Sequence, residues 1–221
     1  MTDRETRKQQ ITAKREEQIL RAATDVFVTK GYDGATIPEI ARLCGAATGT
    51  IYIYYPSKRE LFIAVVKTLI VTPLVSIFKN QKGENFPGTL KEALNDRITV
   101  LQGDAMPSLM ALMGEIQRDD ELRAMFAEKL VKPFLEFMES VYREKILSGE
   151  FREFKPELIV RLIGGMTIGM IMLKNIEGTE SPLNTMPQEE VAEQIMNFIL
   201  YGLMNTARKN TNIKISKNNE L

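Results

Sequence analysis

The amino-acid sequence predicts an all-α protein of about nine helices. Apolar residues recur at spacings of three and four along almost the whole chain, and strand-like alternation never lasts beyond a few residues. Pro107, Pro156 and Pro187 each stand at a predicted first helical turn, where proline is tolerated. The 221 residues suffice for one large or two small domains, because a typical domain has about 100 to 150 residues.

The N-terminal part predicts two helices in series. The first is ended by Gly31, since glycine commonly follows a helix C-terminus. Thr36 caps the second helix, Glu39 completes a capping-box pattern, and Gly45 ends the helix. The apolar stripe of the first helix comprises Ile19, Ala22, Ala23, Val26 and Phe27.

A third short helix is predicted from Ala47 to Tyr54, and a second capping box, Ser57 to Glu60, opens a long fourth helix over 58–78. Pro73 removes a backbone hydrogen bond inside that helix, so we expect a bend at Thr72 and Pro73. Further helices are predicted over 90–101, 107–118, 121–147, 156–176 and 188–209.

The composition argues against several classes of protein. Without histidine, the chain lacks the commonest general base and metal ligand, and we expect no cofactor and no metal. The single Cys44 predicts a small buried hydrophobe in a reducing compartment. The longest largely apolar stretch, 162–173, has 12 residues, against about 18 for a membrane span, and predicts a buried helix. The polar start, 1–10, favours a cytoplasmic protein.

The stretch from Thr36 to Tyr55 has the spacing of a helix-turn-helix. Ala41, Gly45 and Ile51 supply a small residue at the helix crossing, a turn glycine and a buried anchor. Over 14–66 the chain resembles the TetR (tetracycline repressor) family of transcriptional regulators. The resemblance rests on Ile19, Ala22, Ala23, Phe27, Gly31, Tyr32, Thr36, Ile37, Ile40, Ala41, Gly45, Gly49, Ile51, Tyr52, Tyr55, Lys58 and Leu61.

This resemblance implies a helix-turn-helix DNA-binding domain over 1–56 and a helical ligand-binding and dimerisation domain over 57–221. It implies that the third helix enters the major groove, with Ala47, Thr48 and Thr50 facing the base edges. Gly49 either permits close approach to DNA or gives clearance between helices. Tyr55 is expected in the core. Phosphate contacts are implied for Thr36, Tyr52, Tyr54 and Lys58.

The third helix departs from the usual chemistry of base recognition. It contains no Arg, Lys, Asn or Gln, the side chains that make bidentate contacts to guanine or adenine. Contacts with thymine methyl groups, threonine hydroxyls and DNA shape then have to supply specificity. The cations of the N-terminal arm are Arg4, Arg7, Lys8, Lys14 and Arg15. They predict either an arm that lies along phosphates or enters the minor groove, or a solvated, disordered leader.

The C-terminal half is rich in methionine and phenylalanine, which predicts a largely apolar ligand pocket or an ordinary core. Glu115 and Arg118 either contact a polar ligand group or pair with each other. Gly165 and Gly169 admit a closely packed helix, of the same chain or of a second copy. The pocket candidates are Met106, Met110, Met113, Glu115, Phe126, Phe134, Phe137, Met166 and Met170.

The resemblance implies that the last two helices, 156–176 and 188–209, pair with a second copy in a four-helix bundle. The predicted function is a ligand-responsive transcriptional repressor that binds palindromic operator DNA as a homodimer and is released by a small molecule. One alternative is a DNA-binding protein of the same fold controlled by a protein partner. An enzyme is disfavoured, because the chain shows no nucleophile–base pair, metal-ligand spacing or phosphate-binding loop.

Overall fold

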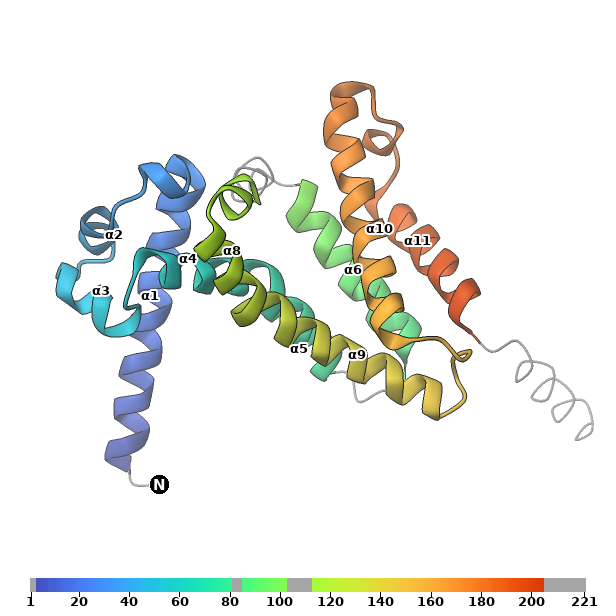
Figure 1. Ribbon diagram of the computed structural model, residues 1–221, viewed down its shortest axis with the longest axis horizontal. Helices are drawn as coiled ribbons and strands as arrows, with labels where there is room; N and C mark the ends of the chain where they lie inside the picture. Colours follow the sequence, from blue (N-terminus) through green and yellow to red (C-terminus); the bar gives the residue numbers. More distant parts are fainter. Residues whose placement is uncertain (1–2, 81–84, 103–112, 205–221) are drawn as a thin grey trace, which may run out of the picture. The chain divides into compact units, whose positions relative to one another are not determined.

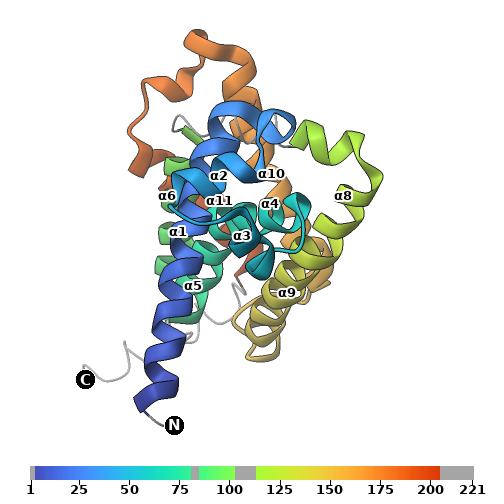
Figure 2. The ribbon, with the colours of Figure 1, turned by 90° about the vertical axis from the view of Figure 1, so that its left-hand side faces the viewer.

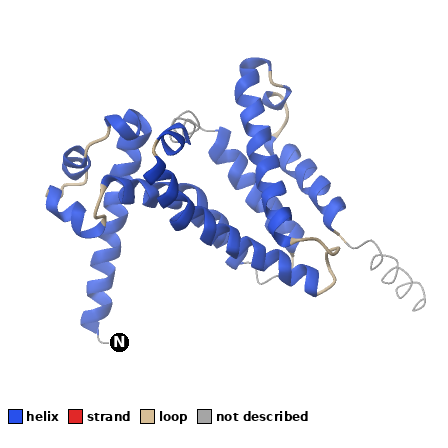
Figure 3. Ribbon diagram, viewed as in Figure 1, coloured by secondary structure: helices blue, strands red, loops and turns tan. Residues whose placement is uncertain are grey.

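A computed structural model describes residues 3–80, 85–102 and 113–204, and the regular elements within these ranges are all helical (Figures 1 and 3). The predicted all-α fold is confirmed. The chain divides into two compact units: unit 1 combines Met1–Pro73 with Gln102–Val131, and unit 2 combines Leu74–Leu101 with Lys132–Leu221. The predicted boundary at residue 56 separates a DNA-binding domain from a ligand-binding and dimerisation domain. It is a division by function and stays a prediction.

Unit 1 begins with helix α1, Asp3–Gly34. The predicted apolar stripe from Ile19 to Phe27 is buried. Gly31 has φ of +70°, in the left-handed region, so the regular helix is interrupted there as predicted. Because the helix already begins at Asp3, the charged segment ahead of the stripe is helical and not a disordered leader.

Three short helices follow, α2 (Ile37–Leu43), α3 (Thr48–Tyr54) and α4 (Lys58–Val66), and the sequence predicted their caps. The Glu39 amide donates to Thr36 Oγ1 at 3.4 Å, and the Glu60 amide donates to Ser57 Oγ at 3.1 Å. Gly45 has φ of +63° in the turn between α2 and α3. Both caps satisfy amide groups that a helix start leaves without a partner.

An aromatic cluster holds α1 against α4. Phe62 is fully buried, and its ring packs edge-on against Phe27 at 5.1 Å and against Tyr32 at 4.9 Å between centroids. Edge-to-face pairs of this kind add stabilisation beyond the burial of apolar area. The cluster therefore packs α4 directly onto the C-terminal part of α1.

Replacing Phe62 with alanine is expected to lower the free energy of unfolding by about 3 to 5 kcal/mol, because it leaves a cavity in this core. Urea denaturation at one fixed protein concentration measures the loss. The control is Leu43→Ala, whose side chain is 51% exposed and should change stability by less than about 0.5 kcal/mol. Equal losses in the two variants would contradict the assigned packing.

The helix that starts at α4 continues through a π turn, Lys67–Val71, into α5, Thr72–Asn80. The predicted irregularity near Pro73 therefore takes the form of a π turn that ends just before Thr72. The Thr72 amide and its hydroxyl both donate to the Lys67 carbonyl, the hydroxyl at 3.1 Å. These bonds supply donors next to Pro73, which has no N–H of its own.

A second helix has the same construction, which the sequence analysis did not anticipate. Helix α8, Asp120–Phe126, passes through a π turn, Ala127–Val131, into α9, Lys132–Leu147. Pro133 follows this turn at the same distance as Pro73 follows the first. Both helices cross from one unit to the other at the residues after their π turns.

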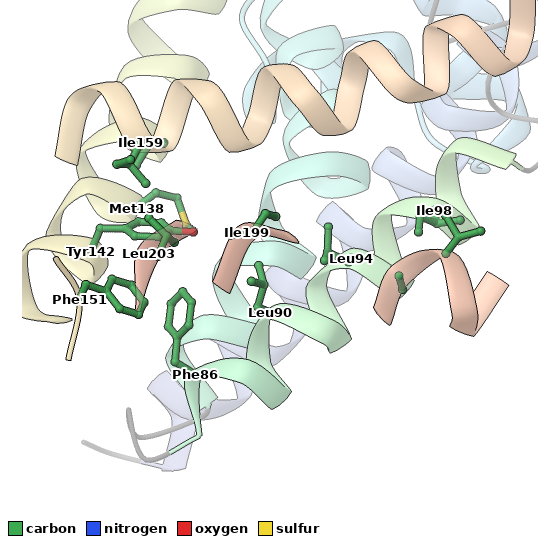
Figure 4. Close-up of a cluster of buried hydrophobic side chains, with 13 residues drawn as sticks. Phe86, Leu90, Leu94, Ile98, Met138, Tyr142, Phe151, Ile159, Ile199 and Leu203 are labelled. Atoms are coloured by element: carbon green, nitrogen blue, oxygen red, sulfur yellow. The ribbon is translucent and has the colours of Figure 1, made fainter. Parts of the chain in front are cut away.

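Unit 2 packs α6 (Phe86–Gln102), α9, α10 (Pro156–Glu177) and α11 (Gln188–Leu203) around one core (Figure 4). Phe86 lies at one end, 4.9 Å from Phe151 and 5.6 Å from Tyr142 between ring centroids. Burial alone raises the pKa of the Tyr142 phenol, so the ring behaves as a core residue.

Helix α11 ends at Leu203 and not at the predicted Lys209. Its end is fixed by the loop after α9: the Arg152 amide donates to the Leu203 carbonyl at 2.8 Å, and Phe151 pairs with Met204 in an isolated bridge. These contacts join segments far apart in the sequence, so helical periodicity alone did not reveal them.

One face of α10 is covered by its own chain and the other is not, so the prediction of a buried helix is only half right. Ile159, Val160 and Ile171 are buried. The opposite face forms an exposed apolar stripe at helical spacing around Gly165 and Gly169; it comprises Leu158, Leu162, Met166, Met172, Leu173 and Ile176. By length and composition, Pro156–Glu180 and Lys58–Asn80 are both apolar enough to cross a membrane.

Candidate nucleic-acid interface

The helix-turn-helix lies beside α1 (Figure 2). Polar contacts fix it to α1 at both of its ends. Lys30 Nζ lies 2.7 Å from Glu39 Oε1 on α2, and the Tyr55 hydroxyl donates to Glu16 Oε1 at 3.1 Å beyond α3. Tyr55 is buried, as predicted. Burial and the neighbouring Glu16 carboxylate both raise the pKa of the Tyr55 phenol, so it stays protonated and able to donate.

Lys58, a predicted phosphate ligand, lies at the first turn of α4 and reaches back to the corner after α1. Its ammonium donates to the carbonyls of Tyr32 at 2.8 Å and Ala35 at 3.2 Å, and lies 4.2 Å from the centroid of the Tyr32 ring. A lysine has three N–H donors, so two of them serve the protein itself. The residue therefore has a positioning role that the sequence analysis did not foresee.

The faces of α3 follow from Ile51, which is fully buried, and Tyr55 one turn later. An α-helix rotates by about 100° per residue, so residues two positions from Ile51 lie on the outward face. The central outward positions are Gly49 and Ile53, of which Ile53 is 81% exposed. The sequence analysis named the first of these two and missed the second.

The other predicted DNA-binding residues surround this outward face. Ala47 is the exposed N-cap residue of α3, and Thr48 and Thr50 are half-buried on its two flanks. Tyr52 is exposed and Tyr54 half-buried. Thr36 lies at the start of α2, where its hydroxyl oxygen already accepts the Glu39 amide. The structure thus brings all eight predicted residues into unit 1, with six of them on or next to α3.

The charged N-terminal segment of α1 extends past α2 and α3 (Figures 1 and 2). Arg7, Lys8, Lys14 and Arg15 share one side of the helix, because they are spaced by one, six and one residues. Glu5, Glu16 and Glu17 lie at other angles. The mixed charges of the sequence are therefore separated into faces, and the arm presents a basic strip.

Ion pairs fix α8 to the beginning of α4 within unit 1. Arg59 lies 2.8 Å from Asp119 and 3.1 Å from Glu121, and Lys129 pairs with Glu60. Asp119 also caps α8, accepting the Leu122 amide at 3.0 Å. That amide first, and Arg59 second, lower the pKa of the Asp119 carboxyl. Helix α4 is thus joined at its start to the helix-turn-helix on one side and to α8 on the other.

The predicted pocket residues fall into separate groups. Phe134, Phe137 and Met170 pack against the core of unit 2, and Met166 lies on the exposed stripe of α10. Unit 1 contains Met113, Glu115 and Phe126, all half-buried. Glu115 pairs with Arg118 at 2.7 Å, which is the second of the two alternatives that the sequence left open for these residues. Met106 and Met110 lie outside the described residues.

Comparison with known proteins agrees with this geometry. Residues 19–65 match the family model described as bacterial regulatory proteins of the tetR family. The chain is 30% identical over 158 residues to the fatty acid metabolism regulator protein of Bacillus subtilis (strain 168), covering 70% of this chain and 78% of that protein. It is 26% identical to the transcriptional repressor AcnR of Corynebacterium jeikeium (strain K411), covering 76% of this chain and 86% of the repressor.

Solved structures show the same fold. The transcriptional regulator FadR of Bacillus subtilis, in complex with stearoyl-CoA, superposes with a TM-score of 0.65. The two chains are 20% identical, and the superposition covers 84% of this chain and 98% of that one.

Proposed function

Because the chain belongs to the TetR family of bacterial transcriptional regulators, we propose that it is a repressor that binds palindromic operator DNA as a homodimer and is released by a small molecule. The observation that carries the proposal is the helix-turn-helix of unit 1. Its second helix, α3, presents an outer face without charged side chains. The relatives are regulators and not enzymes, and a regulator of this kind acts in the cytoplasm, where the DNA is.

The proposed DNA contacts follow the exposed surfaces of unit 1. Helix α3 enters the major groove, whose width of about 12 Å admits one helix. Thr48, Gly49 and Thr50 with Ala47 face the bases, while Thr36, Tyr52, Tyr54 and Lys58 contact phosphate. The basic strip of α1 runs along the phosphate backbone, because a helix about 10 Å wide is too thick for a minor groove of about 6 Å.

The proposed dimer covers the exposed stripe of α10 together with Phe198 and Tyr201 of α11, which are 71% and 82% exposed. A Cβ added at Gly165 or Gly169 would meet no atom within 4 Å in its own chain, so packing within the chain does not explain these glycines. A second copy packed on this stripe explains both the glycines and the apolar surface. We therefore assign the stripe to a partner helix and not to lipid.

The proposed effector is a largely apolar molecule, and we take long-chain acyl-CoA as the first candidate. The support is that one relative is named a fatty acid metabolism regulator and that a protein of the same fold was crystallised with stearoyl-CoA. Phe134, Phe137 and Met170, which are partly buried in unit 2, are the residues we assign to an apolar acyl chain.

Changing Lys58 to alanine is expected to weaken binding to every DNA sequence and to lower the slope of log affinity against log salt by about one counterion unit. Tyr54→Phe should weaken binding in the same uniform way. Thr48→Ala and Thr50→Ala should instead change which bases are preferred. Selection from a random duplex pool, followed by titration at several salt concentrations, measures both effects.

Two results would contradict these assignments. An unchanged selected motif for both threonine variants would move base recognition away from the flanks of α3. A weaker Lys58→Ala protein with an unchanged salt slope would mean that Lys58 acts only through the carbonyls of Tyr32 and Ala35. Failure of the wild-type protein to enrich any duplex would overturn the proposed function itself.

A further inference from the structure

The outermost surface of α3 is apolar and belongs to two residues one turn apart. Gly49 and Ile53 stand opposite the buried Ile51, and Ile53 is the most exposed large hydrophobic residue among the described residues of unit 1. The helix carries no charged side chain. A molecule that binds to the outer face of α3 therefore contacts the Ile53 side chain and the backbone at Gly49.

Gly49 has no structural reason to be glycine within this chain. It does not have positive φ, and a Cβ added to it would meet nothing within 4 Å. Glycine inside a helix is less favourable than alanine by about 1 kcal/mol. The alternative of clearance between helices thus finds no support, and the missing side chain makes room for something outside the protein.

Single exposed apolar residues are common on protein surfaces, so exposure alone does not give Ile53 a role. Its position does. It lies one turn beyond Gly49 on the same outward line, with Thr48 and Thr50 on either side. In the major groove the C5-methyl group of thymine is the apolar feature of the base edges, and apolar side chains recognise it.

We propose that Ile53 is a specificity-determining residue whose side chain contacts a thymine methyl group, with Gly49 giving the clearance that lets the helix lie deep enough for this contact. The inference rests on the proposed DNA-binding function and deepens it. The inference also explains how a helix without Arg, Lys, Asn or Gln distinguishes bases. Such a helix recognises the thymine methyl group, whereas other helices form hydrogen bonds with the base edges.

The test uses the full-length protein and replaces thymine by uracil, which differs only by lacking the methyl group. A duplex is first selected from a random pool with the wild-type protein, and each thymine is then replaced in turn. At one thymine per half-site, replacement is expected to lower the affinity of the protein for the duplex about 3- to 10-fold, the range for one buried methyl contact. Ile53→Ala should bind the thymine and uracil duplexes equally.

Leu147→Ala is the matched control, since Leu147 is 82% exposed on α9 and should keep the full discrimination. Ile53→Ala is not expected to unfold the protein, because the side chain makes little contact within the chain, and thermal denaturation checks this. Equal uracil losses in wild type and Ile53→Ala would overturn the role of Ile53 while leaving DNA binding intact. A wild-type protein that enriches no duplex would instead overturn the proposed function.

Discussion

Replacing Phe198 with glutamate is expected to convert the protein to a monomer and to lower its affinity for a palindromic operator by at least about 100-fold. The affinity falls because two linked DNA-binding domains bind about 10² to 10⁴ times more tightly than one. Phe198 is 71% exposed on α11. In a two-fold interface each substitution introduces a charge on both copies of the patch, and a buried unpaired charge is strongly unfavourable. Sedimentation and operator titration measure the two effects.

Gly165→Leu and Gly169→Leu test the same interface without adding charge, and should weaken the dimer by preventing close approach of the second α10. A Cβ atom at either position meets no atom of its own chain within 4 Å, so folding should be kept, and thermal denaturation checks this. Leu147→Glu, with its exposed position on α9, is the control and should remain dimeric. A monomer at micromolar concentration that still binds a palindrome tightly would disprove the proposed pairing.

Pro73→Ala is expected to leave operator affinity within about tenfold of wild type while reducing its release by effector, which in a coupled protein amounts to about 5- to 150-fold. Helix α4 begins at Lys58, beside the helix-turn-helix, and runs through the π turn into α5 of the other unit. An alanine at position 73 restores the missing N–H and favours a regular helix. The segment after the π turn is then stiffer, so bending there should cost more free energy.

Operator titration with and without stearoyl-CoA, for wild type and Pro73→Ala, measures this coupling. Pro133→Ala offers a comparison in the other helix that has a π turn before a proline. Equal coupling in wild type and Pro73→Ala would show that the turn does not transmit the signal. If stearoyl-CoA leaves wild-type affinity unchanged, the choice of effector is wrong, and the comparison is repeated with other apolar ligands.

The sequence was sufficient wherever a feature depends on neighbouring residues. Thr36 and Ser57 cap their helices, and Gly31 and Gly45 adopt positive φ, because capping and backbone freedom are local properties. The core stripe of α1 followed from helical spacing. The same spacing also fixes the outward angle of Ile53 from Ile51, but an apolar side chain carries none of the polar chemistry that usually marks a base contact.

Features set by distant contacts were not predictable in this way. The inward course of Lys58 depends on carbonyls of the corner after α1, and the end of α11 depends on a loop that follows α9. The N-terminal half of α1 has no apolar stripe, so periodicity gave it no helical signal. The apolar surface of α10 suited a core or an interface equally well until the chain's own packing showed which face it covers.

The two π turns make the number of residues in each of these helices important for the fold. A π turn accommodates one residue more than an α-helical turn, so it acts as a single-residue insertion within a continuous helix. Side chains after Val71 or Val131 are therefore rotated by about 100° from the register of the residues before Lys67 or Ala127. Deleting one residue from either turn would restore an unbroken α-helix and move every later side chain of that helix to a different face. In these two segments a deletion should be tolerated far less well than a substitution.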